Sequence, residues 1–111
     1  MKRHASYKLE EMVRGWFIGD FEPSVIKTSG FEAAVQKYPA GSVESEHYHK
    51  EAIEVTVVVS GKCKMNGHRY VAGDIIVIEP GESNIFEAET NVVTAVIKTP
   101  SVRGDKYLTE G

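Results

Sequence analysis

Residues 41–61 read GSVESEHYHKEAIEVTVVVSG, and the fold prediction starts from this stretch. His47 and His49 are two residues apart, so on an extended strand their side chains leave from the same face and can bind one ion together. Residues 50–53 form a connection short enough for a hairpin loop, which predicts that Glu54 returns beside the two histidines. Two imidazoles and one carboxylate are the ligand set of a divalent first-row transition metal that keeps open coordination positions.

The same stretch resembles the first signature motif of the cupin superfamily at all of its signature positions, which are Gly41, His47, His49, Glu54 and Gly61. A second stretch, GDIIVIEPGESN at 73–84, resembles the second cupin motif in its glycine, its proline and the glycine that follows. The resemblance implies metal ligation by His47, His49 and Glu54. The histidine that cupins carry as fourth ligand falls on Asn84 in this chain.

Three interpretations of Asn84 are open. Its amide oxygen is a weak ligand, or it hydrogen-bonds a metal-bound water or a substrate, or its presence means that metal binding has been lost. Glu51 and Glu82 are possible substitute carboxylates, although each lies in a predicted turn. Imidazole nitrogen and carboxylate oxygen suit iron, manganese, nickel, zinc or cobalt, whereas calcium and magnesium prefer oxygen ligands.

The rest of the chain predicts an all-β protein. About eight to ten short strands alternate with turn signals, a pattern typical of a sandwich or small barrel. The clearest hairpin signal is Asn66-Gly67, because both residues tolerate the positive φ of a type I′ turn. The resemblance narrows the fold to the double-stranded β-helix, or jelly-roll barrel, of cupins. We expect one domain over 1–111, with an arm at 1–15 and a surface tail at 99–111 whose large anchors are Tyr107 and Leu108.

Composition excludes several classes of function. The formal net charge is −3 and the basic residues are scattered, so nucleic-acid binding is not expected. Neither an apolar run long enough to span a bilayer nor the apolar core of a signal peptide is present, which predicts a cytoplasmic protein without a membrane partner. The single Cys63 cannot form an internal disulfide, and we expect it to be a small half-buried side chain.

Residues 54–60, EVTVVVS, are largely apolar on both faces of the predicted strand. A strand with one solvated face should alternate, so this one is expected to be covered on both sides. The outer cover would be the N-terminal arm or a second subunit, and we predict a homodimer.

Two functional hypotheses follow. In the first, the metal serves an enzyme that acts on a small polar molecule, such as a sugar derivative, an amino acid or an organic acid. In the second, the barrel is a non-catalytic small-molecule-binding or assembly module that has lost the chemistry. No nucleophile or general base with a dedicated partner is evident, so whether the protein is an enzyme stays open. Residues expected to point into the barrel are Val43, Ser45, Thr56, Phe86, Tyr38 and Lys98.

Overall fold

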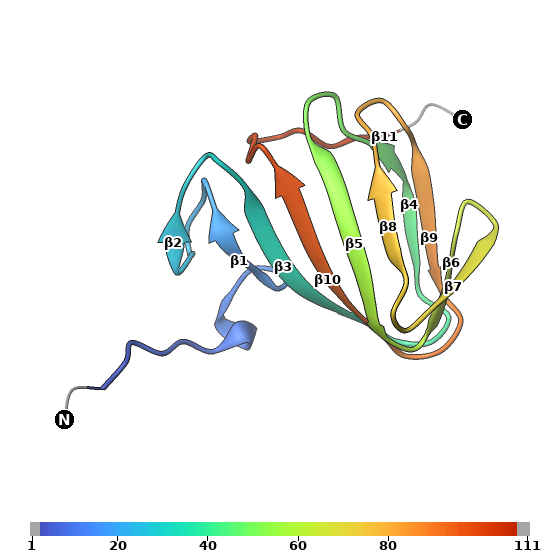
Figure 1. Cartoon of the computed structure of the whole chain (residues 1–111), viewed down its shortest axis with the longest axis horizontal. Helices are drawn as coiled ribbons and strands as arrows, with labels where there is room; N and C mark the ends of the chain where they lie inside the picture. Colours follow the sequence, from blue (N-terminus) through green and yellow to red (C-terminus); the bar gives the residue numbers. More distant parts are fainter. Residues whose placement is uncertain (1–2, 109–111) are drawn as a thin grey trace.

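The computed structural model describes residues 3–108, which form two facing β-sheets (Figure 1). A short 3-10 helix, η1 (Leu9–Glu11), precedes the first strand. The strands are β1 (Trp16–Gly19), β2 (Ile26–Lys27), β3 (Glu32–Tyr38), β4 (Val43–Tyr48), β5 (Ile53–Ser60), β6 (Lys62–Met65), β7 (His68–Val71), β8 (Ile75–Ile78), β9 (Asn84–Ala88), β10 (Val92–Thr99) and β11 (Tyr107–Leu108). The all-β prediction is confirmed.

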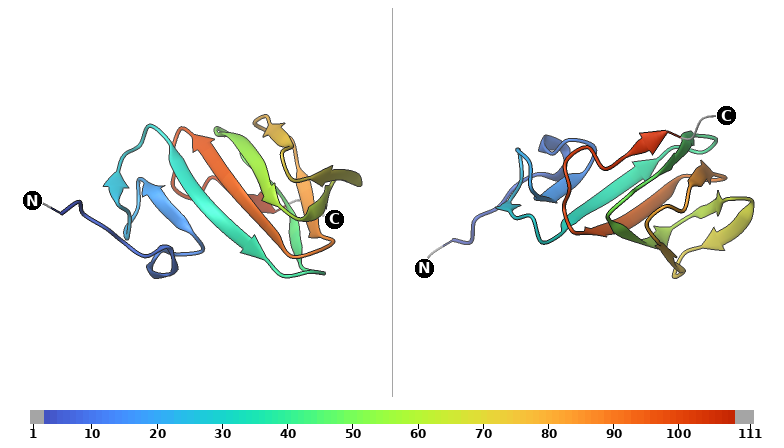
Figure 2. Two further views of the ribbon diagram at one scale, coloured as in Figure 1. Left: turned by 60° about the horizontal axis from the view of Figure 1, so that its bottom comes forward. Right: turned by 90° about the horizontal axis from the view of Figure 1, so that it is seen from above.

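The six-stranded sheet has the order β2-β1-β3-β10-β5-β8, and the five-stranded sheet has the order β11-β4-β9-β6-β7. All pairings are antiparallel except β1 with β2. The two views of Figure 2 show the sheets lying over one another, with the chain passing repeatedly from one to the other. None of the helices among residues 3–108 is long and apolar enough to cross a bilayer.

The apolar core fills one half of the space between the sheets. It consists of aliphatic, sulfur-containing and aromatic side chains from both sheets, namely Val58, Cys63, Met65, Ile76, Ile78, Phe86, Ala88 and Val92. Cys63 is fully buried there, and burial raises the pKa of its thiol. The other half of the interior is polar, and the candidate site lies in it.

Strand register arranges the inner face of the six-stranded sheet in rows. Ile78, Glu54, Lys98 and Glu32 are successive cross-strand partners on β8, β5, β10 and β3. Because side chains alternate along a strand, the neighbouring row, which contains Val55 and Ile97, points to the outer face. The register of these four strands therefore determines which side chains lie on the inner face and which lie on the outer face of this sheet.

The predicted Asn66-Gly67 hairpin is present between β6 and β7, with φ of 52° and 80° at its two residues. Gly61, the last glycine of the first motif, has φ of 90°, and a Cβ added there would lie 2.1 Å from the backbone oxygen of Asn91. The residue must therefore be glycine for β5 to turn into β6 beside β10.

Of the two predicted anchors of the C-terminal tail, one is confirmed. Tyr107 and Leu108 form β11 at the edge of the five-stranded sheet, where the Tyr107 ring stacks on Tyr48 with 5.5 Å between centroids, whereas Leu108 remains 67% exposed. The buried residues of the tail are polar, Ser101 and Asp105. The tail thus enters the interior through hydrogen bonds that hydropathy does not reveal.

Candidate metal and ligand site

The end of β4 and the residue that follows it place both histidines in the interior. His47 and His49 are both buried, and their ring centroids are 5.5 Å apart in an edge-on arrangement. Glu54 reaches the same region from β5, where its Oε1 lies 3.4 Å from His49 Nε2. The structure therefore brings the three predicted ligands into one region, two from the five-stranded sheet side and one from the six-stranded sheet.

Each histidine is oriented by a backbone carbonyl. His49 Nδ1 donates to the carbonyl of Asp105, and His47 Nδ1 donates to the carbonyl of Ser45 over 3.0 Å. A carbonyl oxygen can only accept, so in the neutral rings Nδ1 holds the proton and Nε2 holds the lone pair. This is the pattern found around metal-binding histidines, in which the second ring nitrogen is fixed by an acceptor.

His49 Nε2 is buried and has no hydrogen-bond partner. The 3.4 Å separation from Glu54 Oε1 is an ion-pair distance, too long for a well-formed hydrogen bond. Burial alone would lower the pKa of His49, but the Glu54 carboxylate and the Asp105 carbonyl outweigh it and raise that pKa. Burial would likewise raise the pKa of Glu54, and the contact with His49 holds it below its usual value.

Asn84 begins β9 and is the cross-strand partner of His47. It is buried, and its Nδ2 has no hydrogen-bond partner. It lines a small inner cavity of about 30 Å³ together with His47 and Glu54. By contrast, Glu51 and Glu82 are exposed, and neither is among the described residues that line this cavity.

A larger cavity of about 460 Å³ opens from the same residues, because His47 and Glu54 line both spaces. Lys98 lies in its wall, and its Nζ is 2.8 Å from Glu32 Oε1 and 4.9 Å from the centre of the Trp16 ring. Glu32, Gln36 and Glu44 line it from β3 and β4. Residues of the N-terminal segment between Val13 and Glu22 and of the tail between Ser101 and Lys106 complete the walls.

The prediction that Val43 and Ser45 point inward is wrong. The β4–β9 register shifts between Glu44 and His47, so the bulge places Glu44 rather than its neighbours on the inner side. Val43 is 60% exposed and Ser45 is also exposed. The other predicted inward residues, Tyr38, Thr56, Phe86 and Lys98, do line one of the two cavities.

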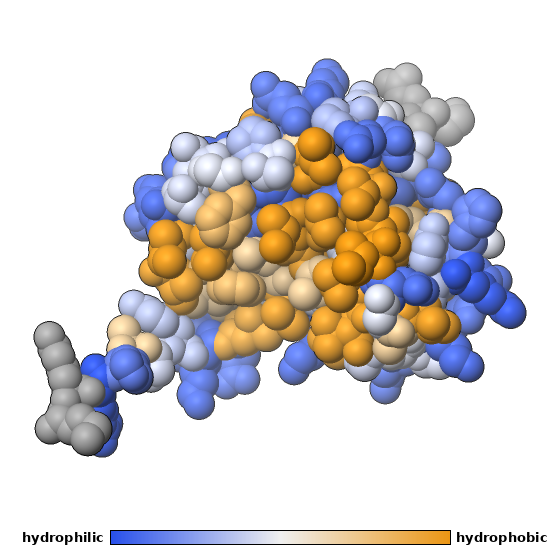
Figure 3. Space-filling view, viewed as in Figure 1, coloured by the Kyte–Doolittle hydropathy of each residue, from blue (hydrophilic) through white to orange (hydrophobic). Residues whose placement is uncertain are grey.

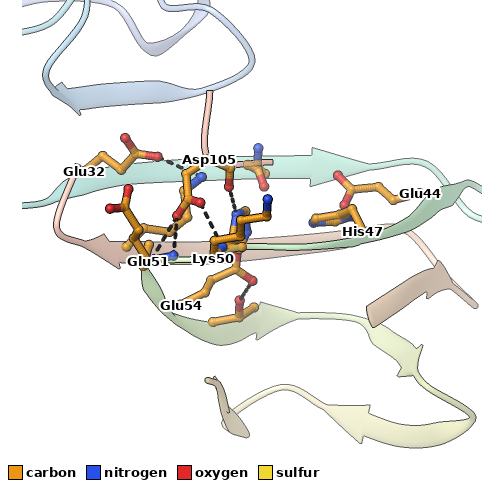
Figure 4. Close-up of polar contacts among 12 residues, drawn as sticks. Glu32, Glu44, His47, Lys50, Glu51, Glu54 and Asp105 are labelled. Atoms are coloured by element: carbon orange, nitrogen blue, oxygen red, sulfur yellow. Dashed lines mark hydrogen bonds and ion pairs between the residues drawn. The ribbon is translucent and has the colours of Figure 1, made fainter. Parts of the chain in front are cut away.

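Glu44 is therefore a cavity residue that sequence reasoning missed. Its Oε1 accepts from the Tyr38 hydroxyl over 3.0 Å, and Figure 4 shows its carboxylate beside the His47 ring. Burial and this carboxylate raise the pKa of Tyr38 well above its usual range, so the phenol stays neutral. Alternation along the strand predicts Glu44 outside, and no signal in the sequence marks the bulge.

Asp105 is the second residue that was missed. Its carboxylate accepts from the backbone N–H groups of Lys50, Glu51 and Ala52 over 2.8, 3.1 and 2.9 Å (Figure 4). Burial would raise the pKa of Asp105, but these donors hold it below its usual value. One residue of the tail thus fixes the β4–β5 loop through its side chain and the His49 ring through its carbonyl.

Among residues 3–108, no group of three His, Cys, Asp or Glu side chains is arranged to hold a metal ion. The donor chemistry nevertheless fits a transition metal, because the buried lone pair of His49 faces a carboxylate and both histidines have their Nδ1 protons fixed.

No protein-family model and no curated protein matches the sequence. Solved structures do match. A conserved protein of Klebsiella pneumoniae with a double-stranded β-helix domain is 20% identical, with a TM-score of 0.72 over 98% of this chain and 100% of that one. The DMSP lyase of Ruegeria pomeroyi is 23% identical, with a TM-score of 0.72 over 86% of this chain and 51% of that one.

The oxalate decarboxylase of Bacillus subtilis, a protein with Mn(II) centres, is 20% identical, with a TM-score of 0.62 over 72% of this chain and 24% of that one. This chain thus spans about half of the lyase and about a quarter of the decarboxylase. The predicted double-stranded β-helix is confirmed, and the chain has the fold of the cupins.

Proposed function

We propose that this protein binds a divalent transition-metal ion through His47, His49 and Glu54 and, next to it, a small carboxylate-bearing molecule in the larger cavity. Asn84 faces the same space and would serve as a weak ligand or as a hydrogen-bond partner of the bound molecule. Fold neighbours include a protein with Mn(II) centres, which supports a metal but does not select manganese here.

The observation that carries this proposal is the unpartnered nitrogen of His49. A buried polar atom without a partner is costly, and evolved interiors rarely leave one. A cation held by His49 and Glu54 would satisfy both side chains. It would also compensate the burial of the carboxylate.

The class of bound molecule is inferred from Lys98. Glu32 contacts one side of its ammonium group, and an ammonium group carries three donors. Lys98 is the cross-strand partner of Glu54, so its remaining donors lie one strand away from the proposed ion. A carboxylate that reaches the ion would meet Lys98 at its other end, which favours organic acids or amino acids over neutral sugars.

When bound, the ion would act as a Lewis acid toward a carboxylate or carbonyl oxygen of the bound molecule. The residues of the chain would orient the acid, Lys98 through its charge and Trp16 through its ring. The neutral Tyr38 would hold Glu44 beside His47. The tail and the N-terminal segment would limit the access of water, because both form walls of the cavity.

A non-catalytic binding module is the second candidate. It is favoured by the finding that, within residues 3–108, no three His, Cys, Asp or Glu side chains lie close enough together to hold a metal ion. In that case the cavity would bind its small molecule through Lys98 and neighbouring polar groups alone, and removal of metal would leave binding unchanged.

The test is elemental analysis and metal titration of protein purified without an affinity tag. We expect wild type to bind a stoichiometric ion and His47→Ala to lose it. The matched control is His68→Ala, because His68 is exposed on the β6–β7 hairpin. Trace metal in wild type, or equal metal in wild type and His47→Ala, would refute the metal site.

A further inference from the structure

We infer that the small inner cavity binds a primary ammonium group, with Glu44 as its counter-ion, so that the molecule bound beside the proposed ion is an amino acid. The choice of an amino acid rests on the proposed function, which assigns the carboxylate end of the molecule to Lys98. The ammonium subsite itself depends only on residues of the inner cavity, so it can be tested with the ion removed.

Glu44 is a cavity carboxylate without a cationic partner. It is half-buried, and within residues 3–108 its only hydrogen bond is the one with the Tyr38 hydroxyl. Arg14 lines the larger cavity but not the inner one, and none of the described ion pairs joins it to Glu44. Glu54 would be bound by the proposed ion, and the remaining carboxylates of the larger cavity have ammonium or N–H partners, namely Asp20, Glu22, Glu32 and Asp105. A half-buried carboxylate without such a partner is costly, and a cationic ligand would remove this cost.

The surroundings of Tyr38 are short of hydrogen-bond donors. The Tyr38 hydroxyl oxygen lies 2.7 Å from Gln36 Oε1 and 3.0 Å from Glu44 Oε1, but a neutral phenol carries one hydrogen. The Gln36 amide cannot turn to supply another, because its Nε2 donates to the Arg14 carbonyl over 3.3 Å and a carbonyl only accepts. Two acceptors therefore share one hydrogen, and an ammonium group would supply the donors that Glu44 lacks.

Two further polar groups of the inner cavity have no partner within residues 3–108. They are Thr94 Oγ1 and Asn84 Nδ2, whose residues are 1% and 3% exposed and line this cavity together with Glu44. The Thr94 hydroxyl can accept a hydrogen bond, and the Asn84 amide can rotate to present its oxygen. Glu44, Thr94 and Asn84 lie on β4, β10 and β9. The cavity thus offers three acceptors, which matches the three N–H donors of a primary ammonium group.

The volume of the inner cavity limits the size of the head group. The cavity measures about 30 Å³, and a group the size of a water molecule needs about 10–15 Å³. A primary ammonium group therefore fits, whereas a trimethylammonium group does not. Met65, Phe86 and Val96 supply apolar walls, and an apolar surrounding strengthens the attraction between Glu44 and a bound cation.

The six-stranded sheet places polar side chains on its inner side at this cavity. Figure 3 shows its outer face as a mainly apolar surface over β3, β10, β5 and β8. Gln36 and Thr94 are cross-strand partners in the wall of the inner cavity, and Lys98 follows on the same strand as Thr94. Because Glu44, Gln36 and His47 line both cavities, a molecule with its carboxylate at Lys98 can extend its amine into the inner one.

The ammonium subsite is tested by NMR titration of the whole chain with methylammonium chloride in the presence of a chelator. We expect saturable shifts of the Asn84 side-chain amide and the Thr94 backbone amide, and no such shifts with tetramethylammonium chloride. Glu44→Gln keeps the side-chain size and an oxygen acceptor for Tyr38, and it should raise the dissociation constant at least about tenfold. Thr94→Val should also raise it without lowering the free energy of unfolding, because the hydroxyl has no partner within residues 3–108. Glu87→Gln is the matched control, because Glu87 is exposed on β9 and lines neither cavity.

Calorimetry on metal-loaded protein tests whether the bound molecule is an amino acid. Glycine, β-alanine and γ-aminobutyrate are each compared with the acid that lacks the amine, and at least one should bind at least about tenfold more tightly than its counterpart. Glu44→Gln should abolish this preference without weakening the binding of malonate.

The inference is overturned by equal methylammonium binding in wild type and Glu44→Gln, by equal shifts with tetramethylammonium, or by the lack of an amine preference in all pairs. Failure of malonate to bind, with methylammonium binding intact, would instead refute the role of Lys98 in the proposed function and support the ammonium subsite.

Discussion

At the scale of single residues, we propose that Asn84 sets how strongly the proposed ion is held. It is buried beside His47, and its amide lacks a partner for Nδ2. Replacement by histidine would add an imidazole at the position where cupins place their fourth ligand. Changes around metal ligands alone alter affinity by about 10- to 100-fold, so Asn84→His should tighten metal binding at least about tenfold.

Competition titration against a chelating dye measures this change. The control is Lys37→His, on the exposed outer side of β3, which should leave affinity unaltered. Unchanged affinity in Asn84→His would place residue 84 outside the coordination shell.

Substitution of Lys98 tests whether the bound molecule is an organic acid. Lys98→Met keeps most of the side-chain volume but removes the ammonium group beside Glu54. Because a hydrogen bond to a charged group contributes about 1.5–3 kcal/mol, binding of a small dicarboxylate such as malonate should weaken about 10- to 100-fold.

Calorimetry on metal-loaded protein measures this loss, and metal affinity should be retained. Lys37→Met is the matched control, since Lys37 is exposed on the opposite face of the sheet. Equal malonate binding in wild type and Lys98→Met would exclude this role for the lysine.

At the scale of elements, Asp105 connects the tail to the β4–β5 loop. In Asp105→Asn the neutral amide replaces a carboxylate that accepts three backbone N–H groups. Buried donors left without an acceptor cost about 1–3 kcal/mol, so the free energy of unfolding at pH 7 should fall by about that amount. Chemical denaturation measures it, and an unchanged midpoint would contradict the role of the contact.

The same contact predicts a pH dependence. The pKa of Asp105 is lower in the folded protein than in the unfolded chain, so its stabilisation is present above the unfolded value and is lost as pH falls through the folded one. The difference in stability between wild type and Asp105→Asn should therefore shrink below about pH 4. Denaturation midpoints at a series of acidic pH values test this sign.

Elements also show where sequence reasoning works and where it stops. The β4–β5 connection, the Asn66-Gly67 hairpin and the aliphatic β8 depend on neighbouring residues, and all are predictable from local patterns. The bulge that brings Glu44 inside is a property of the β4–β9 pairing, and the Asp105 contacts join residues 53 to 55 positions apart. Such features depend on the assembled sheets, so alternation and hydropathy could not reveal them.

At the scale of the whole molecule, the proposed ion should stabilise the fold. A ligand that binds only the folded state at 100 times its dissociation constant adds about 2.7 kcal/mol to the free energy of unfolding. For a domain of this size each kcal/mol raises the melting temperature by about 4–8 °C. Differential scanning fluorimetry should therefore show a rise of at least about 10 °C, reversed by chelator. His49→Ala should show no rise, and an equal rise in that variant would point to binding elsewhere.

The alternation of β5 ties the proposed site to the outer face of the six-stranded sheet. Glu54 points to the interior with Lys98 as its partner, and Val55 points to the outer face with Ile97 as its partner. A slip of one residue against β10 would exchange them, because every side chain of a strand changes face when the register shifts by one. A misregistered chain would place a carboxylate among the aliphatic side chains of the outer face and an aliphatic group beside His49. Insertion or deletion of one residue within β5 should therefore abolish metal binding, and neither face of the sheet can change its register independently of the other.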